Sequence, residues 1–245
     1  MTAEIAIMNK EAIAIAADSA VTLREGKIFT SANKIFSLSK YHPVGVMIYG
    51  NANFMGIPWE TMIKTYRGDL YTEKFDTLKE YADDFINFLS REKRLIPESE
   101  QEKYFEDNVY SYFSLIRYEI VQRVNETISE RDVVTDGEIN KITSEIIENN
   151  HDKWEGVESP PTIPENHTKD LINKYGNVIN KAKKDVFENL LLTDHLSRRL
   201  TEIAVNLFVK FIEGVDPPNM SGVVIAGFGE KDIFPSLQSF LIEVI

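Results

Sequence analysis

Strand-like segments at both ends of the chain enclose a long stretch with helical spacing, and this order most restricts the fold. Short runs rich in Ile and Val fill residues 2–50 and return from Gly222 to Ile245. Between about Ile57 and Gly214, apolar side chains instead recur at the three- and four-residue intervals of amphipathic helices. We therefore expect strand-forming regions at both ends of the chain and a mostly helical region between them.

Paired strands are expected in three places, each as two apolar runs around a short polar turn. The predicted pairs are Thr2–Met8 with Ala12–Ala17, Lys34–Ser39 with Val44–Gly50, and Gly222–Phe228 with Ser236–Ile245. A further short strand is predicted at Lys27–Thr30. The alanines of residues 12–17 favour strands only weakly, so propensity alone leaves a helix open there. Apolar residues on both faces favour a buried strand of a layered protein.

Six helices are predicted from the spacing of apolar residues. The first follows Pro58 and the second lies within Thr77–Arg94, where six apolar side chains share one face. The others are predicted at Glu98–Glu130, Gly137–Trp154, Thr168–Asn189 and Thr193–Gly214. Three prolines mark Gly156–Thr168 as a linker. One aromatic run is predicted to pack in a helical core rather than bind a ligand: Tyr104, Phe105, Tyr110, Tyr112, Phe113 and Tyr118.

Charge and cysteine usage exclude several classes of protein. The 245 residues include 27 basic and 39 acidic side chains and no cysteine, and the net charge of −12 lies entirely after residue 60. Without a basic tract, binding to nucleic acid or to anionic lipid is not expected. No apolar run is long enough for a membrane span or resembles a signal peptide. We expect a soluble cytoplasmic protein with no thiolate zinc site and no cysteine nucleophile.

The four histidines give no sign of a metal site. His42, His151, His167 and His195 lie in separate turn or helical segments, without the close spacing of metal ligands. No dinucleotide-binding or phosphate-binding glycine motif occurs. We expect these histidines at the surface, and we expect neither a cofactor nor a metal ion.

Thr2 is the residue with the clearest chemical potential. Methionine aminopeptidases generally remove Met1 when the next side chain is small, which would make Thr2 the mature N-terminus. An N-terminal threonine carries a hydroxyl nucleophile and an α-amino group whose reference pKa of about 7.7–8.0 suits a general base. One residue can then supply both groups.

Hairpin geometry is expected to place Asp18 beside Thr2 and Lys34 beside Gly50. If the first hairpin turns about Lys10, paired residue numbers sum to 20, so Asp18 lies opposite Thr2; a two-residue turn would place Ala17 there. In the second hairpin, a four-residue turn gives pairs that sum to 83, with Lys34 opposite Tyr49 and one step from Gly50.

Thr2, Asp18, Lys34 and Gly50 form a candidate site. A Lys34 ammonium near Thr2 would lower the pKa of the threonine amine and hydroxyl, and Asp18 would hold Lys34 charged and oriented. Gly50 lacks a Cβ, so its N–H could serve as an oxyanion donor. Taken singly, each position has a simpler interpretation: an Asx turn for Asp18, a solvated lysine for Lys34 and relief of crowding for Gly50.

The same residues resemble the start of a proteasome β-type subunit, an N-terminal-nucleophile (Ntn) hydrolase. The resemblance covers about residues 2–70, from Thr2 through Ile13–Ser19 and Asn33–Phe36 to Gly45–Gly50, and more weakly residues 222–245. With Met1 removed, the intervals of 16 residues from Thr2 to Asp18 and 32 from Thr2 to Lys34 equal those of the family's catalytic Thr, Asp and Lys.

The resemblance implies a four-layer α/β/β/α sandwich within an α+β fold, and a threonine peptidase that cleaves a peptide or protein substrate. It implies Thr2 as nucleophile and base, Lys34 as the pKa modulator, Asp18 as the partner of Lys34, and Gly50 as the oxyanion donor. Homo-oligomers that form rings are also implied. The resemblance also divides the chain into a core, formed by residues 1–90 and 217–245, and an acidic helical insertion, formed by residues 91–216.

Two departures from the family leave alternatives open. The family joins its corresponding strands through one or two helices, whereas this chain adds more than a hundred residues there. The family also continues beyond the last hairpin with residues that complete the site, so this chain is expected to be a fragment or a divergent member. The alternatives are a non-catalytic Ntn-fold protein whose insertion mediates assembly or protein interaction, and a hydrolase of non-peptide amides.

Overall fold

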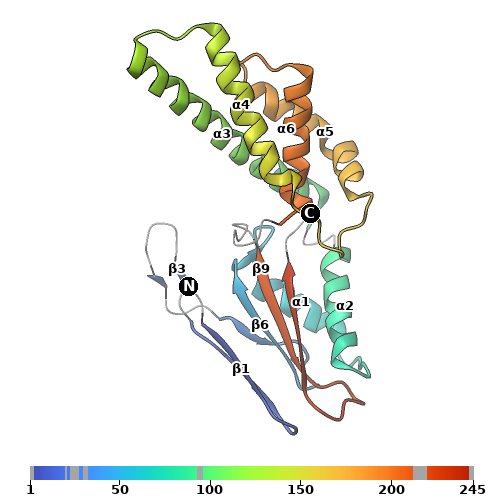
Figure 1. The fold of residues 1–245 in the computed structure, drawn as a ribbon. Helices are drawn as coiled ribbons and strands as arrows, with labels where there is room; N and C mark the ends of the chain where they lie inside the picture. Colours follow the sequence, from blue (N-terminus) through green and yellow to red (C-terminus); the bar gives the residue numbers. More distant parts are fainter. Residues whose placement is uncertain are drawn as a thin grey trace. The chain divides into compact units, whose positions relative to one another are not determined.

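The computed structural model describes residues 3–19, 21–22, 28–29, 33–92, 96–211 and 220–242 (Figure 1). The chain divides into two compact units, Met1–Glu98 with Pro218–Val244, and Ser99–Pro217. Helices account for 54% and strands for 18%, and the sheets are antiparallel, so the predicted α+β class is confirmed. The sequence prediction set the corresponding boundaries at 90/91 and 216/217.

A four-stranded antiparallel sheet forms the centre of the first unit. Its order is β10-β9-β6-β5. The strands are β5 (Ile35–Ser37), β6 (Val44–Gly50), β9 (Ser221–Gly227) and β10 (Ser236–Ile242). β6 pairs along its whole length with β9, from Val44 opposite Gly227 to Gly50 opposite Ser221. Strands from the two ends of the sequence therefore share one sheet.

Three two-stranded sheets accompany the central one. They are β1 (Glu4–Met8) with β2 (Ile13–Ala17), β3 (Val21–Thr22) with β4 (Ile28–Phe29), and β7 (Asn53–Phe54) with β8 (Ile57–Pro58). The turn between β1 and β2 is held by the Asn9 side chain, whose Oδ1 accepts hydrogen bonds from the amides of Glu11 and Ala12 at 2.7 and 2.8 Å. An asparagine in this role mimics a backbone turn.

Two helices pack on one face of the central sheet. They are α1 (Trp59–Leu70) and α2 (Leu78–Arg91). The Trp59 indole nitrogen donates to Ser221 Oγ of β9 at 2.9 Å, which fixes the start of α1 against the sheet. Thr77 begins α2 with a capping box in which its hydroxyl and the Glu80 carboxylate each accept a backbone amide hydrogen. The six residues of the predicted α2 stripe are all buried: Leu78, Tyr81, Ala82, Phe85, Phe88 and Leu89.

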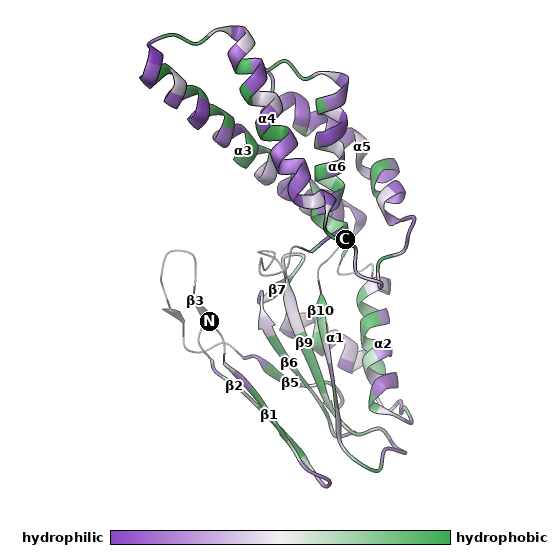
Figure 2. Ribbon diagram, viewed as in Figure 1, coloured by the Kyte–Doolittle hydropathy of each residue, from purple (hydrophilic) through white to green (hydrophobic). Residues whose placement is uncertain are grey.

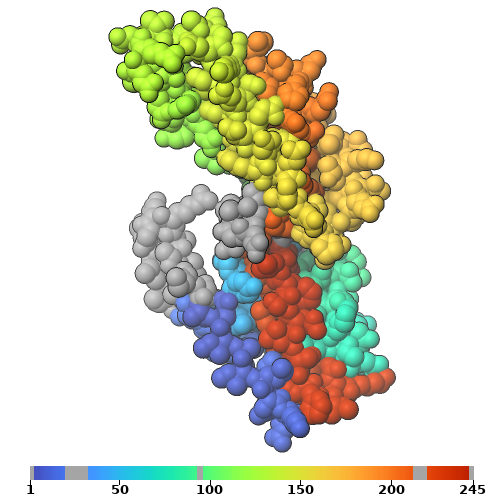
Figure 3. Space-filling model, viewed as in Figure 1, coloured from blue at the N-terminus to red at the C-terminus, as the bar shows by residue number. Residues whose placement is uncertain are grey.

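The β1–β2 hairpin contacts the opposite face of the sheet. A Cβ on Gly45 would lie 3.3 Å from Ile15 Cδ1, so the absence of a side chain at Gly45 permits this close approach. Gly45 pairs with Ala226, whereas Ser221, which bonds Trp59, lies an odd number of residues away and so faces the other side. On the outside of the hairpin, Ile5 and Ile7 are 58% and 69% exposed, and Figure 3 shows this hairpin in blue at the surface.

The second unit consists of helices alone in the described residues. They are α3 (Glu98–Arg131), α4 (Asp136–Glu155), α5 (His167–Val186) and α6 (Asp194–Val209). Each helix contributes to one hydrophobic core. Figure 2 shows the resulting mixture of hydrophobic and hydrophilic residues along each helix. No helix in the described part of the chain is both long and apolar enough to cross a membrane.

The aromatic run of α3 packs largely as predicted. Phe105 and Phe113 are fully buried, and Tyr104, Tyr110 and Tyr112 lie partly buried against the same core. The prediction is wrong for Tyr118, which is 61% exposed. The buried residues of α3 end at Ile120, so the last part of this helix offers few side chains to the core.

Candidate active site

Asp18 and Lys34 form an ion pair although sixteen residues separate them. Lys34 Nζ lies 2.5 Å from Asp18 Oδ1. The Lys34 side chain is only 10% exposed and that of Asp18 is 33% exposed. Asp18 directly follows β2 and Lys34 directly precedes β5, and these two strands contact each other. The contact between the hairpin and the central sheet is therefore what brings the two charges together.

The register of the first hairpin differs from the prediction. Glu4 pairs with Ala17 and Met8 with Ile13, so paired numbers sum to 21 rather than 20. The Asp18 amide donates to the Ala3 carbonyl at 3.0 Å, which places Asp18 opposite Ala3 instead of Thr2. The predicted register is wrong because the Asn9 side chain holds a four-residue turn, which moves every pair by one position.

The second hairpin is also displaced by one residue. Ile35 pairs with Met47, and the Ile48 amide donates to the Lys34 carbonyl at 2.8 Å, so Lys34 lies opposite Ile48 and not Tyr49. The connection from Ser39 to Pro43 is one residue longer than predicted. Ser39 holds it, since its Oγ accepts hydrogen bonds from the amides of Tyr41 and His42 at 3.2 Å.

Gly50 ends β6, two residues beyond the position opposite Lys34. Its φ of +77° lies in the region that favours glycine. A Cβ there would approach the Met220 carbonyl oxygen to 2.6 Å. The backbone conformation and this contact therefore explain why glycine occupies the position. The role of Gly50 as an oxyanion donor stays a prediction.

Thr2 lies outside the described residues. Its neighbour in the chain, Ala3, accepts the Asp18 amide hydrogen at 3.0 Å. Asp18 is therefore bonded through its backbone to the residue that follows the predicted nucleophile.

Glu4 is a charged neighbour of the ion pair that the sequence reasoning missed. Burial raises the pKa of its carboxyl, whereas the nearby Lys34 charge lowers it and Asp18 raises it. Among the described residues, Glu4 Oε1 has no hydrogen-bond partner. The β1–β2 pairing is what could have identified Glu4. Glu4 lies opposite Ala17, on the same side of the hairpin as Ile15.

The ion pair favours an ionised Asp18 carboxylate. The hydrogen bond from Lys34 and its positive charge lower the pKa of Asp18. A lysine ammonium can also lower the pKa of a neighbouring amine or hydroxyl by Coulomb interaction.

Acidification should remove the stabilisation that this pair provides. Lys34 lowers the pKa of Asp18 below its ordinary 3.8. The stabilisation of the fold by the ion pair is therefore fully present above pH 3.8 and is lost as the pH falls through the lowered pKa. We expect the difference in free energy of unfolding between the wild type and Asp18→Asn to be constant above about pH 5 and to shrink below pH 4. Urea unfolding across this range measures it, and a difference independent of pH would contradict the assignment.

Comparisons of the chain with protein-family models, with curated proteins and with solved structures find no match.

Proposed function

We propose that this chain is an Ntn hydrolase similar to proteasome β-type subunits, which hydrolyses peptide bonds with Thr2 after removal of Met1. The observation that carries the proposal is the Asp18–Lys34 ion pair. These are the two residues that sequence intervals relate to Thr2, and they meet at 2.5 Å beside the start of β1. A chance match of intervals gives no reason for the two side chains to meet.

The layers of the first unit also support this proposal. Helices α1 and α2 lie on one face of the central sheet and the β1–β2 hairpin on the other, an order that fits three layers of an α/β/β/α sandwich. In the proposed arrangement, the candidate site lies between the two β layers. Asp18 and Lys34 adjoin the ends of strands, so the strand backbone fixes their positions.

In the proposed mechanism, Thr2 Oγ1 attacks the carbonyl carbon of the scissile bond while its proton passes to the Thr2 α-amino group. The tetrahedral intermediate then expels the amine product, which takes up that proton, and an ester acyl-enzyme remains. Water, deprotonated by the α-amino group, hydrolyses the ester and restores the hydroxyl. Lys34 keeps the pKa of the amine and hydroxyl low, Asp18 orients Lys34, and the Gly50 N–H stabilises the oxyanion.

Replacement of Lys34 by Met should greatly reduce hydrolysis of a fluorogenic peptide. Methionine keeps much of the aliphatic length of lysine but removes the charge that lowers the pKa of the amine. We expect a loss in kcat/KM of about 100-fold or more, the usual size for a group that governs proton transfer. The pH at which activity reaches half its maximum should also rise, because the amine would titrate nearer its ordinary pKa.

Lys40→Met is the matched control for this experiment. Lys40 is exposed, and its substitution removes the same charge at a position outside the ion pair. It should retain nearly full activity. Equal activity in the two variants would count against a role for Lys34 in the chemistry.

Assembly and location belong to the same proposal. The resemblance to ring-forming subunits leads us to propose a homo-oligomer that acts in the cytoplasm. Light scattering of the purified chain gives the number of copies in the particle.

A second candidate function is protein interaction through the helical unit. It is favoured by the independent core of α3 to α6 and by apolar side chains of α3 that remain at its surface. These are Leu115, Tyr118, Val121 and Ile128. A Thr2→Ala variant with unchanged function, together with loss of complex formation on deleting residues 137–192, would favour this candidate over catalysis.

A further inference from the structure

Helices α4 and α6 bring a group of titratable side chains together inside the helical unit. The sequence prediction placed all four histidines at the surface, but His151 is 5% exposed. The His42 side chain is also largely covered, at 8% exposed. The residues around His151 are Glu148 and Asp152 on α4 and His195, Arg199 and Glu202 on α6. Glu148, His151 and Asp152 are close in sequence, but the α6 members are not, so the sequence did not reveal the whole group.

The two ring nitrogens of His151 have different neighbours. His151 Nε2 lies 2.8 Å from Glu202 Oε2 and 3.1 Å from Arg199 Nη1. In the tautomer that carries its proton on Nε2, this nitrogen donates to Glu202, and Arg199 Nη1 donates to Glu202 at 3.2 Å. Nδ1 then carries a lone pair, and within the described chain it has no hydrogen-bond partner although it is buried.

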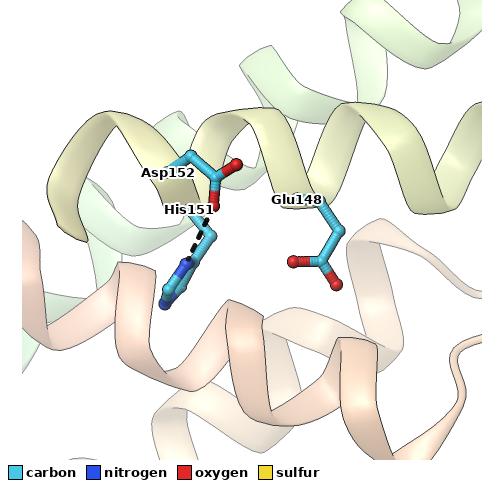
Figure 4. Close-up of side chains that lie close together, drawn as sticks. All are labelled: Glu148, His151 and Asp152. Carbon is cyan, nitrogen blue, oxygen red and sulfur yellow. Dashed lines mark ion pairs between the residues drawn. The ribbon is translucent and has the colours of Figure 1, made fainter.

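Two carboxylates of α4 lie near His151. His151 Nδ1 lies 3.7 Å from Asp152 Oδ1, and Glu148 extends from the same helix one turn earlier (Figure 4). One ligand atom from each of these residues lies within 4.8 Å of the others. Zinc bonds to nitrogen and oxygen are about 2.0–2.2 Å long, so two ligand atoms in a tetrahedral site lie about 3.4 Å apart. Binding an ion therefore requires side-chain rotations that draw the three atoms together.

The surrounding charges suit a divalent cation. Glu148, Asp152 and Glu202 are acidic and Arg199 is basic, so acidic side chains outnumber this basic one by three to one. Arg199 pairs with Glu202 and with Glu148 Oε2, each at 3.2 Å. Within the described residues, Asp152 on the Nδ1 side forms no ion pair with Arg199.

We propose that Glu148, His151 and Asp152 bind a divalent transition-metal ion, with Zn²⁺ as the ion that fits this donor set. An imidazole nitrogen with carboxylate oxygens suits zinc, whereas Mg²⁺ and Ca²⁺ prefer oxygen ligands alone. Glu202 holds the His151 tautomer that leaves Nδ1 free. His195 Nε2, 2.5 Å from Glu148 Oε1, orients that carboxylate. The site lies in the helical unit, so the proposal goes beyond the proposed hydrolase and does not depend on Thr2.

Zinc affinity of the purified full chain tests the proposal. The protein is stripped with a chelator and titrated with Zn²⁺ against a chromogenic chelator. We expect one tight site per chain, a loss of affinity of about 100-fold or more in His151→Ala, and a loss of at least about 10-fold in Asp152→Asn. Asp152 is 62% exposed, so its substitution leaves the fold intact. Glu202→Gln retains all three ligands and should weaken binding by about 10- to 100-fold.

His167→Ala is the matched control, since it removes a histidine of α5 that lies outside the group. It should bind Zn²⁺ like the wild type, and so should Thr2→Ala. Zn²⁺ should raise the melting temperature of the wild type and of His167→Ala, but not that of His151→Ala. A wild type that binds no Zn²⁺ at micromolar concentration would overturn the proposal, as would an Asp152→Asn variant with unchanged affinity.

Discussion

Thr2→Ala should abolish peptide hydrolysis, with a fall in kcat/KM of at least about 10⁴-fold, the scale seen when a nucleophile is removed from a hydrolase. The alanine variant keeps the α-amino group and the Asp18–Lys34 pair. It lacks the hydroxyl that would form the ester acyl-enzyme. Steady-state hydrolysis of a fluorogenic peptide measures the loss, and it should exceed that of Lys34→Met because no other group can replace the nucleophile.

Thr2→Ser provides the control for this substitution. Serine keeps both the hydroxyl and the amine, so this variant should retain measurable activity. Ala, Ser and Thr are all small enough for Met1 removal, so processing of the N-terminus is the same in the three proteins. Wild-type activity in Thr2→Ala would show that another residue performs the reaction.

Phe105→Ala should destabilise the helical unit by about 3–5 kcal/mol, the range for large aromatic residues removed from a core. Phe105 is fully buried, and its ring stacks on Tyr175 at 4.3 Å and on Phe208 at 4.7 Å between centroids. Alanine would remove contacts that join α3 to both α5 and α6. Urea unfolding followed by helical circular dichroism gives the change in free energy.

Tyr118→Ala is the control on the same helix. This residue is also aromatic, but it is 61% exposed, so its loss should change stability by less than about 0.5 kcal/mol. Phe105→Leu should lie between the two, since leucine refills part of the space. If Phe105→Ala were no more destabilised than Tyr118→Ala, the aromatic stack would not be the centre of this core.

Local patterns explain which elements could be predicted from the sequence. The stripe from Leu78 to Leu89 is buried in full because one helix face is set by residues three and four apart, which the sequence displays directly. The pairing of β6 with β9 was predictable in kind, since both ends of the chain carry strand pattern and strands must find partners. Tyr118 was misplaced because periodicity shows a helix face but not where the neighbouring helices end.

Side chains that act across turns and between helices explain the errors. Asn9 and Ser39 hold their turns through hydrogen bonds to backbone amides, and each turn shifts its hairpin by one residue. Strand pattern alone does not reveal such bonds. His151 was expected at the surface because its partner Glu202 lies 51 positions later in the sequence, on another helix. Asp18 and Lys34 adjoin β2 and β5, strands of different sheets, so strand pairing alone does not bring them together; only the resemblance of their intervals to those of a known family related them.

The mature N-terminus tests the central claim most directly. Intact-mass spectrometry of the purified chain should give a mass without Met1. After incubation with an electrophile directed at N-terminal threonine, it should show one added probe per chain, located by fragmentation on Thr2. Thr2→Ala should lose Met1 but take up no probe. A mature protein that retains Met1 could not use the Thr2 amine as a base, and that result would contradict the proposed function.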